Sequence, residues 1–239
     1  MNDALQQRID AAETLLQRIA SDFAPAAFAS SFGAEDMVLT DLVARRDRGI
    51  EIFTLDTGKL PEETHRLMRE TVGRYGIRLR VYVPDERAAE AYVAEHGPDA
   101  FFRSVALRKA CCHIRKVEPL RRALSGKRAW ITGLRRGQAV TRGGLALESF
   151  DAEFGLMKFN PLADWSNQDV WDYIRNFEVP YNALHDHGYP SIGCAPCTRA
   201  VAAGEDIRAG RWWWEQPESR ECGLHAGPDG RRRRITEAA

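Results

Sequence analysis

This sequence of 239 residues lacks a membrane-spanning apolar run, an excess of basic residues and a secretory signal. No run approaches the ~18 consecutive apolar residues that span a bilayer, so we expect no membrane partner. Lysine and arginine (34) balance aspartate and glutamate (34) to a net charge of 0, which argues against a nucleic-acid-binding protein. The amino-terminal stretch has neither the basic nor the apolar segment of a secretory signal, so we expect a cytoplasmic protein.

Cysteine is scarce, with five residues in the chain. An odd number in a reducing compartment does not suit a disulfide framework. Cys111 and Cys112 are adjacent, Cys194 and Cys197 are separated by two residues, and Cys222 stands alone. This spacing favours four metal ligands and one reactive thiol. Five unrelated buried thiols are the alternative.

The adjacent pair bears on the kind of metal site. Neighbouring side chains on a helix project about 100° apart, so Cys111 and Cys112 are poorly placed to bind one small ion together. A cubane cluster is larger and lets each thiolate bind a different iron. The pair therefore favours an iron–sulfur cluster, with a strained zinc site as the alternative.

Hydrophobic periodicity predicts strands that alternate with helices. The expected strands cover 26–31, 50–55, 77–83 and 128–133, and the expected helices cover 3–20, 34–46, 61–75, 88–96 and 104–115. Pro61 suits the first position of its helix, and the last of these helices could continue to 124. A hairpin is expected at 145–160, then a helix with Ser166 as its N-cap. Loops are expected after about 181.

This alternation indicates an α/β protein with a doubly wound, mostly parallel sheet of the Rossmann type. Ligands of such sheets bind beyond the carboxyl ends of the strands. Polar residues and glycines follow three of the predicted strands, at 31–33, 56–58 and 132–136. We therefore expect one shared pocket there, in which the turn at 30–36 offers backbone N–H groups to a phosphate or sulfate.

A polyanionic ligand also requires cations, and arginine forks match planar oxyanions. The candidates are Lys116, Arg135, Arg136, Arg142, Arg208 and Arg211. For each of them the alternative is an ordinary solvated surface residue. We interpret His65, His96, His185 and His187 as structural or surface residues.

Cys222 has Arg220, Gly223 and His225 nearby. Cationic neighbours lower a thiol pKa, and a thiolate on a mobile tail suits a nucleophile that meets first a substrate and then a second protein. A stray surface thiol is the alternative. Three consecutive tryptophans at 212–214 either anchor this tail or pack as an ordinary apolar segment. The arginine run at 231–234 is interpreted as solvated tail.

Eight segments together resemble a known family. They are Ser-Ser-Phe-Gly-Ala-Glu-Asp at 30–36, Leu-Asp-Thr-Gly at 55–58, Arg-Lys-Ala-Cys-Cys-His-Ile-Arg-Lys at 108–116, Thr-Gly-Leu-Arg-Arg-Gly-Gln at 132–138, Lys-Phe-Asn-Pro-Leu at 158–162, Gly-Cys-Ala-Pro-Cys-Thr-Arg at 193–199, Gly-Arg-Trp-Trp-Trp-Glu at 210–215 and Glu-Cys-Gly-Leu-His at 221–225. In this order they resemble the bacterial, thioredoxin-dependent adenylyl-sulfate reductases of the PAPS/APS reductase family. The resemblance extends from about residue 26 to 225.

The resemblance implies a fold related to the PP-loop, adenine nucleotide α-hydrolase-like proteins, with a loop-rich carboxyl-terminal tail. It implies Cys222 as the catalytic nucleophile and a 4Fe–4S cluster on Cys111, Cys112, Cys194 and Cys197. We expect a nucleotide-binding, cluster-bearing domain at 1–205 and a mobile tail at 206–239. The expected substrate-binding residues are Ser30, Ser31, Phe32, Gly33, Leu55, Thr57, Gly58, Lys116, Gly133, Arg135, Arg136, Arg142, Arg208 and Arg211.

The implied reaction, in sulfate assimilation toward cysteine, reduces adenosine 5′-phosphosulfate to sulfite and AMP through S-sulfocysteine on Cys222. Thioredoxin or glutaredoxin would be the reductant. Relatives that use the 3′-phosphorylated nucleotide generally lack the cluster cysteines, so the unphosphorylated nucleotide is favoured. The same chemistry on the 3′-phosphorylated nucleotide and an ATP-dependent PP-loop sulfurtransferase remain the rivals. The 30–36 turn departs from the pattern Ser-Gly-Gly-x-Asp-Ser of the PP-loop pyrophosphatases, which argues against the sulfurtransferase. Relatives are often homo-oligomers, but the sequence shows no interface pattern.

Overall fold

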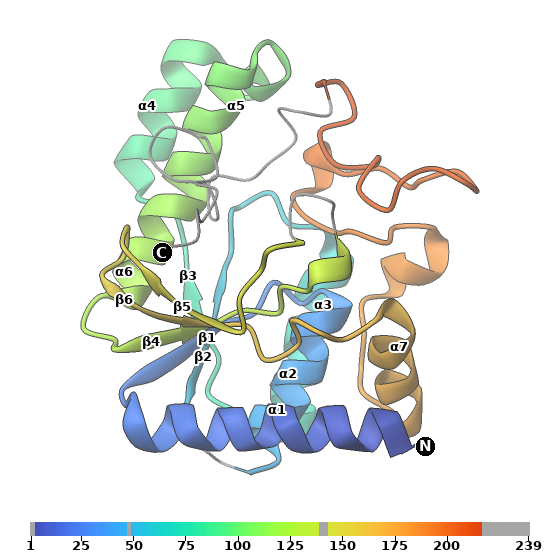
Figure 1. The fold of residues 1–239 in the computed structure, drawn as a ribbon. Coiled ribbons are helices and arrows are strands. Elements are labelled where there is room, and N and C mark those ends of the chain that lie inside the picture. Colours follow the sequence, from blue (N-terminus) through green and yellow to red (C-terminus); the bar gives the residue numbers. More distant parts are fainter. Residues whose placement is uncertain (1–2, 47–48, 139–142, 217–239) are drawn as a thin grey trace, which may run out of the picture.

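The computed structural model describes residues 3–46, 49–138 and 143–216. In this part of the chain a six-stranded sheet has the order β3-β2-β1-β4-β6-β5, with helices on both faces (Figure 1). The strands are β1 (Ala26–Ala29), β2 (Glu51–Leu55), β3 (Arg80–Tyr82), β4 (Ala129–Ile131), β5 (Glu148–Asp151) and β6 (Leu156–Phe159). All neighbouring pairs are parallel except the β5–β6 hairpin. The predicted doubly wound, mostly parallel sheet is therefore confirmed.

The α-helices fall where periodicity predicts them, with small shifts at their ends. They are α1 (Asp3–Asp22), α2 (Ala34–Ala44), α3 (Glu62–Tyr75), α4 (Glu86–His96), α5 (Val105–Cys112), α6 (Glu118–Leu124) and α7 (Asn167–Asn176). Pro61 is the N-cap of α3 rather than its first helical residue, because its ψ of 150° is extended. Strand β3 is shorter than the expected 77–83. No described helix has both the length and the apolar character needed to cross a bilayer.

Side chains alternate between the two faces of the sheet, as a period of two residues requires. Phe28 and Ile131 pack on one face in a core shared with α1, α2, α3 and α7. Phe53 and Trp130 pack on the other face against Leu120 of α6. Full burial of each such side chain contributes about 2–3 kcal/mol to stability, so both faces of the sheet are fixed by their helices.

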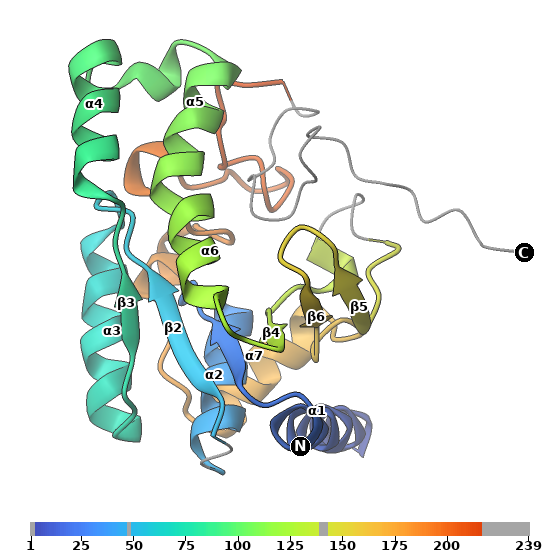
Figure 2. The ribbon, with the colours of Figure 1, turned by 90° about the vertical axis from the view of Figure 1, so that its left-hand side faces the viewer.

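The helix expected at 104–115 begins at N-cap Ser104, whose Oγ accepts the Leu107 N–H at 3.2 Å. It continues to Leu124 through a π-helical turn at His113–Val117 that joins α5 to α6 (Figure 2). Pro119 gives the physical reason, because proline lacks an N–H and its ring clashes with the carbonyl four residues earlier. The widened turn relieves that clash without ending the helix.

The segment at 198–216 folds back on the main body of the protein. Thr198 forms an antiparallel bridge with Arg211, and the Arg199 N–H donates to the Gly210 carbonyl at 3.0 Å. A Cβ at Gly210 would overlap the Arg199 carbonyl oxygen, so this close approach requires glycine. Trp212 is 1% exposed. The expected boundary at 205/206 is therefore not marked by a break in packing as far as residue 216.

The N-cap of α7 forms the reciprocal pair of hydrogen bonds known as a capping box. Ser166 Oγ accepts the Asp169 N–H at 3.1 Å, and Asp169 Oδ2 accepts the Ser166 N–H at 2.7 Å. Two N–H groups that the helix itself leaves unpaired are satisfied in this way. The predicted N-cap is confirmed.

We expect Ser166→Ala to lower the free energy of unfolding by about 1 kcal/mol, because an orphan N–H of α7 loses its acceptor. Urea denaturation followed by circular dichroism measures this change. Ser125→Ala, at an exposed serine beyond the end of α6, is the control and should stay within about 0.5 kcal/mol of the parent. Equal losses in the two variants would contradict the role of the cap.

Candidate functional site

A cavity of about 700 Å³ lies beyond the carboxyl ends of β1, β2 and β4. Ser30 and Ser31 line it from the end of β1, Leu55 and Thr57 from β2, and Gly133 from β4. The three strand ends expected to share a pocket therefore line one cavity. Its volume suits a nucleotide-sized ligand.

The expected substrate-binding residues divide between this cavity and other places. Those that line it are Ser30, Ser31, Gly33, Leu55, Thr57, Lys116, Gly133, Arg135, Arg208 and Arg211. Phe32, Gly58 and Arg136 are not among its lining residues. Arg142, and the expected nucleophile Cys222, lie outside the described residues.

The turn after β1 satisfies its own N–H groups. The Ser31 N–H donates to Asp36, that of Phe32 to Ser30 Oγ at 3.3 Å, and that of Gly33 to Ser31 Oγ at 3.4 Å. Phe32 adopts a left-handed φ of 59° and its ring is 1% exposed, so it packs in the core rather than in the cavity. These three N–H groups therefore have side-chain acceptors, where we expected them to be open to a phosphate.

Asp36, in the first turn of α2, joins the loops that follow β1 and β4. Its carboxylate accepts the Ser31 N–H at 2.7 Å and the Ser31 Oγ at 2.5 Å, and also a backbone hydrogen bond from Gly133. A Cβ at Gly133 would overlap Asp36 Oδ1, so glycine is needed there. Burial raises the pKa of Asp36 to about 6, although the hydrogen bonds from Ser31 oppose the rise.

Arg135 and Arg136 have partners within the protein. Arg135 is 3% exposed, and its Nε and Nη2 donate to Glu35 Oε1 at 2.9 and 2.7 Å. Its guanidinium thus fixes the rim of the cavity against α2. Arg136 donates to the Leu145 carbonyl at 2.8 Å and pairs with Asp164, away from the cavity.

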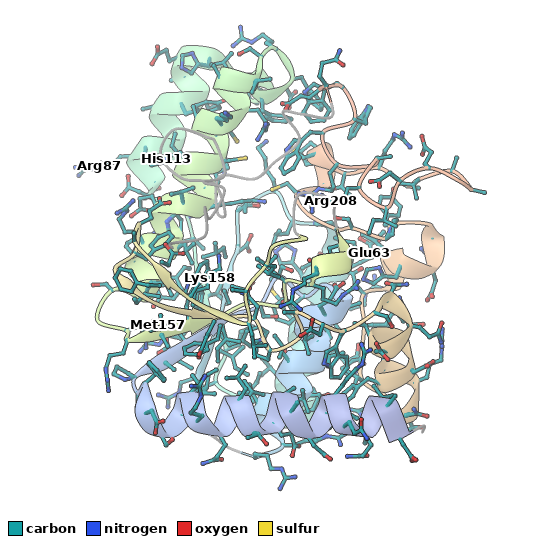
Figure 3. The ribbon with its side chains drawn as sticks, viewed as in Figure 1. Glu63, Arg87, His113, Met157, Lys158 and Arg208 are labelled. Atoms are coloured by element: carbon teal, nitrogen blue, oxygen red, sulfur yellow. The ribbon has the colours of Figure 1, made fainter. Side chains whose placement is uncertain are left out.

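Three further cations line the cavity from two other elements. Lys116 comes from the π-helical turn, and Arg208 and Arg211 come from the carboxyl-terminal segment, on which Figure 3 labels Arg208. Arg211 is 7% exposed, and its Nη1 lies 3.2 Å from the Ile192 carbonyl oxygen. Gly193 allows this approach, since a Cβ there would overlap the guanidinium. Lys116 and Arg211, which are distant in sequence, therefore both lie close to Cys197.

His185 also lines the cavity, which the sequence did not indicate. Its ring packs edge-on against Trp171 with centroids 5.3 Å apart. Burial lowers the pKa of His185, which favours neutral imidazole, and a hydrogen bond to the Tyr189 backbone holds the ring. Its Nε2 is buried and has no hydrogen-bond partner among the residues that the structure describes. A ligand group that donates a hydrogen bond would satisfy this atom.

The four expected cluster ligands are all buried, at 7–8% exposure. Cys111, Cys194 and Cys197 pack in one group with Phe101 and Trp212. Cys112 instead lies against the Arg108 guanidinium, to which it is hydrogen-bonded. The divergence of two neighbouring side chains on a helix, argued from the sequence, is therefore present in the structure.

The surroundings of these thiols combine burial with positive charge. Burial raises the pKa of Cys111 and raises that of Cys197 to about 12. Two nearby cations, Arg115 and Lys59, oppose the rise in the pKa of Cys111. Lys116 and Arg211 oppose the rise in the pKa of Cys197. Buried thiols beside cations suit ligands that lose their protons when a metal binds. Among the described residues, however, no three His, Cys, Asp or Glu side chains surround a position for a single metal ion.

The cysteines and the cavity share residues. Thr57 lines the cavity, and its Oγ1 lies 3.3 Å from Cys194 Sγ. Trp212 lines the cavity and packs among the cysteines. Lys116 and Arg211 line the cavity and are close enough to Cys197 to oppose the rise in its pKa. The two sites are thus adjacent parts of one larger site.

Residues 25–200 match the protein-family model described as the phosphoadenosine phosphosulfate reductase domain. The chain belongs to this family. Its matched region contains the whole sheet and all four buried cysteines, which places the strand-end cavity and the thiols within the family domain.

Several relatives within the family are similar over most of their length. The chain is 55% identical over 223 residues to the adenosine 5′-phosphosulfate reductase of Allochromatium vinosum, covering 93% of this chain and 87% of the relative. It is 51% identical over 221 residues to the protein of that name from Burkholderia cepacia, covering 92% and 88%.

Solved structures agree on the fold. The phosphoadenylyl-sulfate reductase of Candida auris superposes with a TM-score of 0.69 at 26% identity, covering 84% of this chain and 98% of that one. Yeast FAD synthetase superposes with a TM-score of 0.57 at 15% identity, covering 82% and 67%, and so shows a shared fold alone. The chain therefore has the α/β architecture of the phosphosulfate reductases and their nucleotide-binding neighbours.

The raised pKa of Asp36 predicts a pH-dependent stability. The rise of this pKa from 3.8 to about 6 corresponds to a contribution of about 3 kcal/mol to the free energy of unfolding. This contribution is fully present below pH 3.8 and is lost as the pH rises through 6. We expect the free energy of unfolding of Asp36→Asn to rise relative to the parent by up to about 3 kcal/mol between pH 4 and pH 8. Urea denaturation series for both proteins across this range measure the difference. Parallel pH profiles would contradict the assignment.

Proposed function

We propose that this protein reduces adenosine 5′-phosphosulfate to sulfite and AMP. The observation that carries the proposal is the placement of a cation-lined, nucleotide-sized cavity beside four buried cysteines. Relatives about 50% identical to this chain bear the name of this activity.

The nucleotide would lie across the ends of β1, β2 and β4. Lys116, Arg208 and Arg211 supply the positive charge that a phosphosulfate requires, because all three line the cavity. Arg135 contributes less directly, since its guanidinium is paired with Glu35. The buried Nε2 of His185 suits a hydroxyl or amino group of the nucleoside.

Cys222 is proposed as the nucleophile. Its thiolate attacks the sulfate sulfur, a bond forms between the two sulfur atoms, and AMP leaves with the electrons of the broken sulfur–oxygen bond. The cations in the cavity stabilise the negative charge that develops on the leaving phosphate. The product on the protein is S-sulfocysteine.

A dithiol protein such as thioredoxin or glutaredoxin completes the reaction. Its first thiolate attacks Cys222 Sγ, sulfite leaves with the electrons of the sulfur–sulfur bond, and a mixed disulfide forms. Its second thiol then resolves that disulfide and restores the Cys222 thiol. The dithiol gives up two electrons and the sulfate sulfur gains two.

We propose further that Cys111, Cys112, Cys194 and Cys197 hold a 4Fe–4S cluster. Four buried thiols beside cations fit a group that requires four thiolates. The absence of a single-ion position among the described residues does not count against a cluster, whose ligands are spread around a larger core. When bound, the cluster supplies charge beside Lys116 that adjusts the field at the sulfate, while the electrons come from the thiols.

The direct test is intact mass spectrometry after anaerobic incubation with adenosine 5′-phosphosulfate and no reductant. We expect a sulfonate adduct that peptide mapping locates on Cys222 and that reduced thioredoxin removes with release of sulfite. An adduct with the 3′-phosphorylated nucleotide alone would overturn the choice of substrate. No adduct with either nucleotide, together with hydrolysis of ATP to AMP and pyrophosphate, would favour a sulfurtransferase.

The division of the cysteines into four ligands and one nucleophile is tested by two variants. Cys222→Ser should abolish sulfite release and leave the iron content unchanged, because Cys222 is not among the proposed ligands. Cys197→Ser should lower the iron content, because it removes a buried thiol from the group of four. Loss of iron in Cys222→Ser would show that the division is wrong. Iron is measured by colorimetric assay of the purified proteins.

Gly133→Ala should weaken AMP binding at least tenfold, because the added Cβ overlaps Asp36 and displaces the loop after β4. Isothermal titration calorimetry with AMP measures the affinity. Gly137→Ala is the matched control, since its Cβ would lie an ordinary 3.8 Å from Arg135 Nη1. Similar affinities of the two variants would argue that the Asp36–Gly133 contact does not shape the nucleotide site.

A further inference from the structure

Arg108, on α5, is the most deeply buried charge near the cysteines. Its residue exposure is 0%, and its partner Glu215 is 7% exposed. Arg108 Nε and Nη2 each donate to one oxygen of the Glu215 carboxylate, both at 2.8 Å. This fork-to-fork geometry joins two elements that are 107 residues apart in the chain.

Trp212 completes the contact between α5 and the carboxyl-terminal segment. The guanidinium carbon of Arg108 lies 4.7 Å from the centroid of a Trp212 ring, and that of Arg211 lies at the same distance. Arg211 and Trp212 both line the cavity. A line of contacts therefore runs from Glu215 through Arg108 and Trp212 to a cation of the site.

Stability alone does not account for this pair. Removing two charges from water costs about as much as their attraction returns, and apolar replacements of buried pairs are often neutral. A bidentate pair does specify one relative placement of the two elements that carry it. The same Arg108 also contacts Cys112, so the placement is defined relative to the cysteines.

We propose that Arg108 and Glu215 are positioning residues that fix where the carboxyl-terminal segment docks on α5. The pair holds residues 211–215 beside the cysteines and the cavity, so that the chain that leads to Cys222 starts from a defined point. Six residues lie between Glu215 and Cys222 in the sequence, and the seven Cα-to-Cα steps of an extended chain span at most about 25 Å. The position of Glu215 thus limits where the nucleophile can reach. This inference rests on the proposed function of Cys222.

The test compares one rate and one affinity between variants. Glu215→Gln removes the charge and one acceptor oxygen. We expect it to slow formation of the Cys222 adduct at saturating adenosine 5′-phosphosulfate at least tenfold, without added reductant. Its affinity for adenosine, measured by calorimetry, should change less than threefold, because Asp36, Gly133 and the strand ends are untouched and adenosine lacks the phosphate that Arg211 would bind. A merely structural role would lower the rate and the affinity together.

Two further variants make the result decisive. Glu62→Gln is the matched control, since Glu62 forms an exposed ion pair with Arg69 outside the site, and it should react at the parental rate. Glu215→Asp keeps the buried charge but shortens its reach by one methylene. It should fold even where Glu215→Gln does not, and it should react three- to tenfold slower than the parent.

Each outcome has one interpretation. A parental rate in Glu215→Gln, or in Glu215→Asp should the first variant not fold, would overturn the inference, as would equal losses of rate and adenosine affinity. Failure of the unmodified protein and of Glu62→Gln to form any adduct would instead overturn the proposed function. A slow adduct with intact adenosine affinity supports the positioning role.

Discussion

The carboxylate of Asp36 bridges two loops that the sheet alone does not connect. Strands β1 and β4 are hydrogen-bonded neighbours, but the chain leaves them toward different elements. Ser31 and Gly133 both donate to Asp36, so the two loops keep a fixed separation at the mouth of the cavity. Glu35, the residue before Asp36 in α2, forms an ion pair with Arg135 of the loop after β4 and so holds that loop against the helix as well. The shape of the site therefore depends on adjacent acidic residues that bind protein groups rather than ligand.

The cysteine side of the site carries positive charge. Lys116 and Arg211 line the cavity close to Cys197, whereas the acidic residues that also line it are engaged by groups of the protein. An elongated anionic ligand can therefore lie with its neutral part over the strand ends and its charged part toward Cys197. This polarity favours chemistry at the charged end of the ligand, which is where a phosphosulfate carries its reactive bond.

The fold was largely predictable because its signals are local. Periodicity located the alternating strands and helices, and the Ser166 cap is visible in four consecutive residues. The pairing of Arg135 with Glu35 and of Arg108 with Glu215 was not predictable, because each spans about a hundred residues and arginine occurs throughout the chain. His185 was missed because a single histidine in a loop has no spacing to indicate its role.

The π-helical turn was missed although Pro119 marks it in the sequence. A proline inside a helical pattern can either end the helix or be accommodated by a wider, π-helical turn. The sequence does not decide between these two outcomes, because tertiary packing does. The same packing brought Arg208 and Arg211 to one cavity, whereas the sequence alone indicated only that both are cations. The expected site residues that do not line it, Phe32, Gly58 and Arg136, belong to the same motifs as residues that do.

The widened turn between α5 and α6 also sets an angular relationship. Each residue of an α-helix turns the chain by about 100°, so one residue accommodated in a π-helical turn rotates everything before it relative to everything after it. Leu120 and Leu124 can therefore pack against the sheet while Cys111 packs with Cys194 and Cys197. One continuous helix thus contributes to two separate cores, because the wider turn lets its two halves direct their side chains independently.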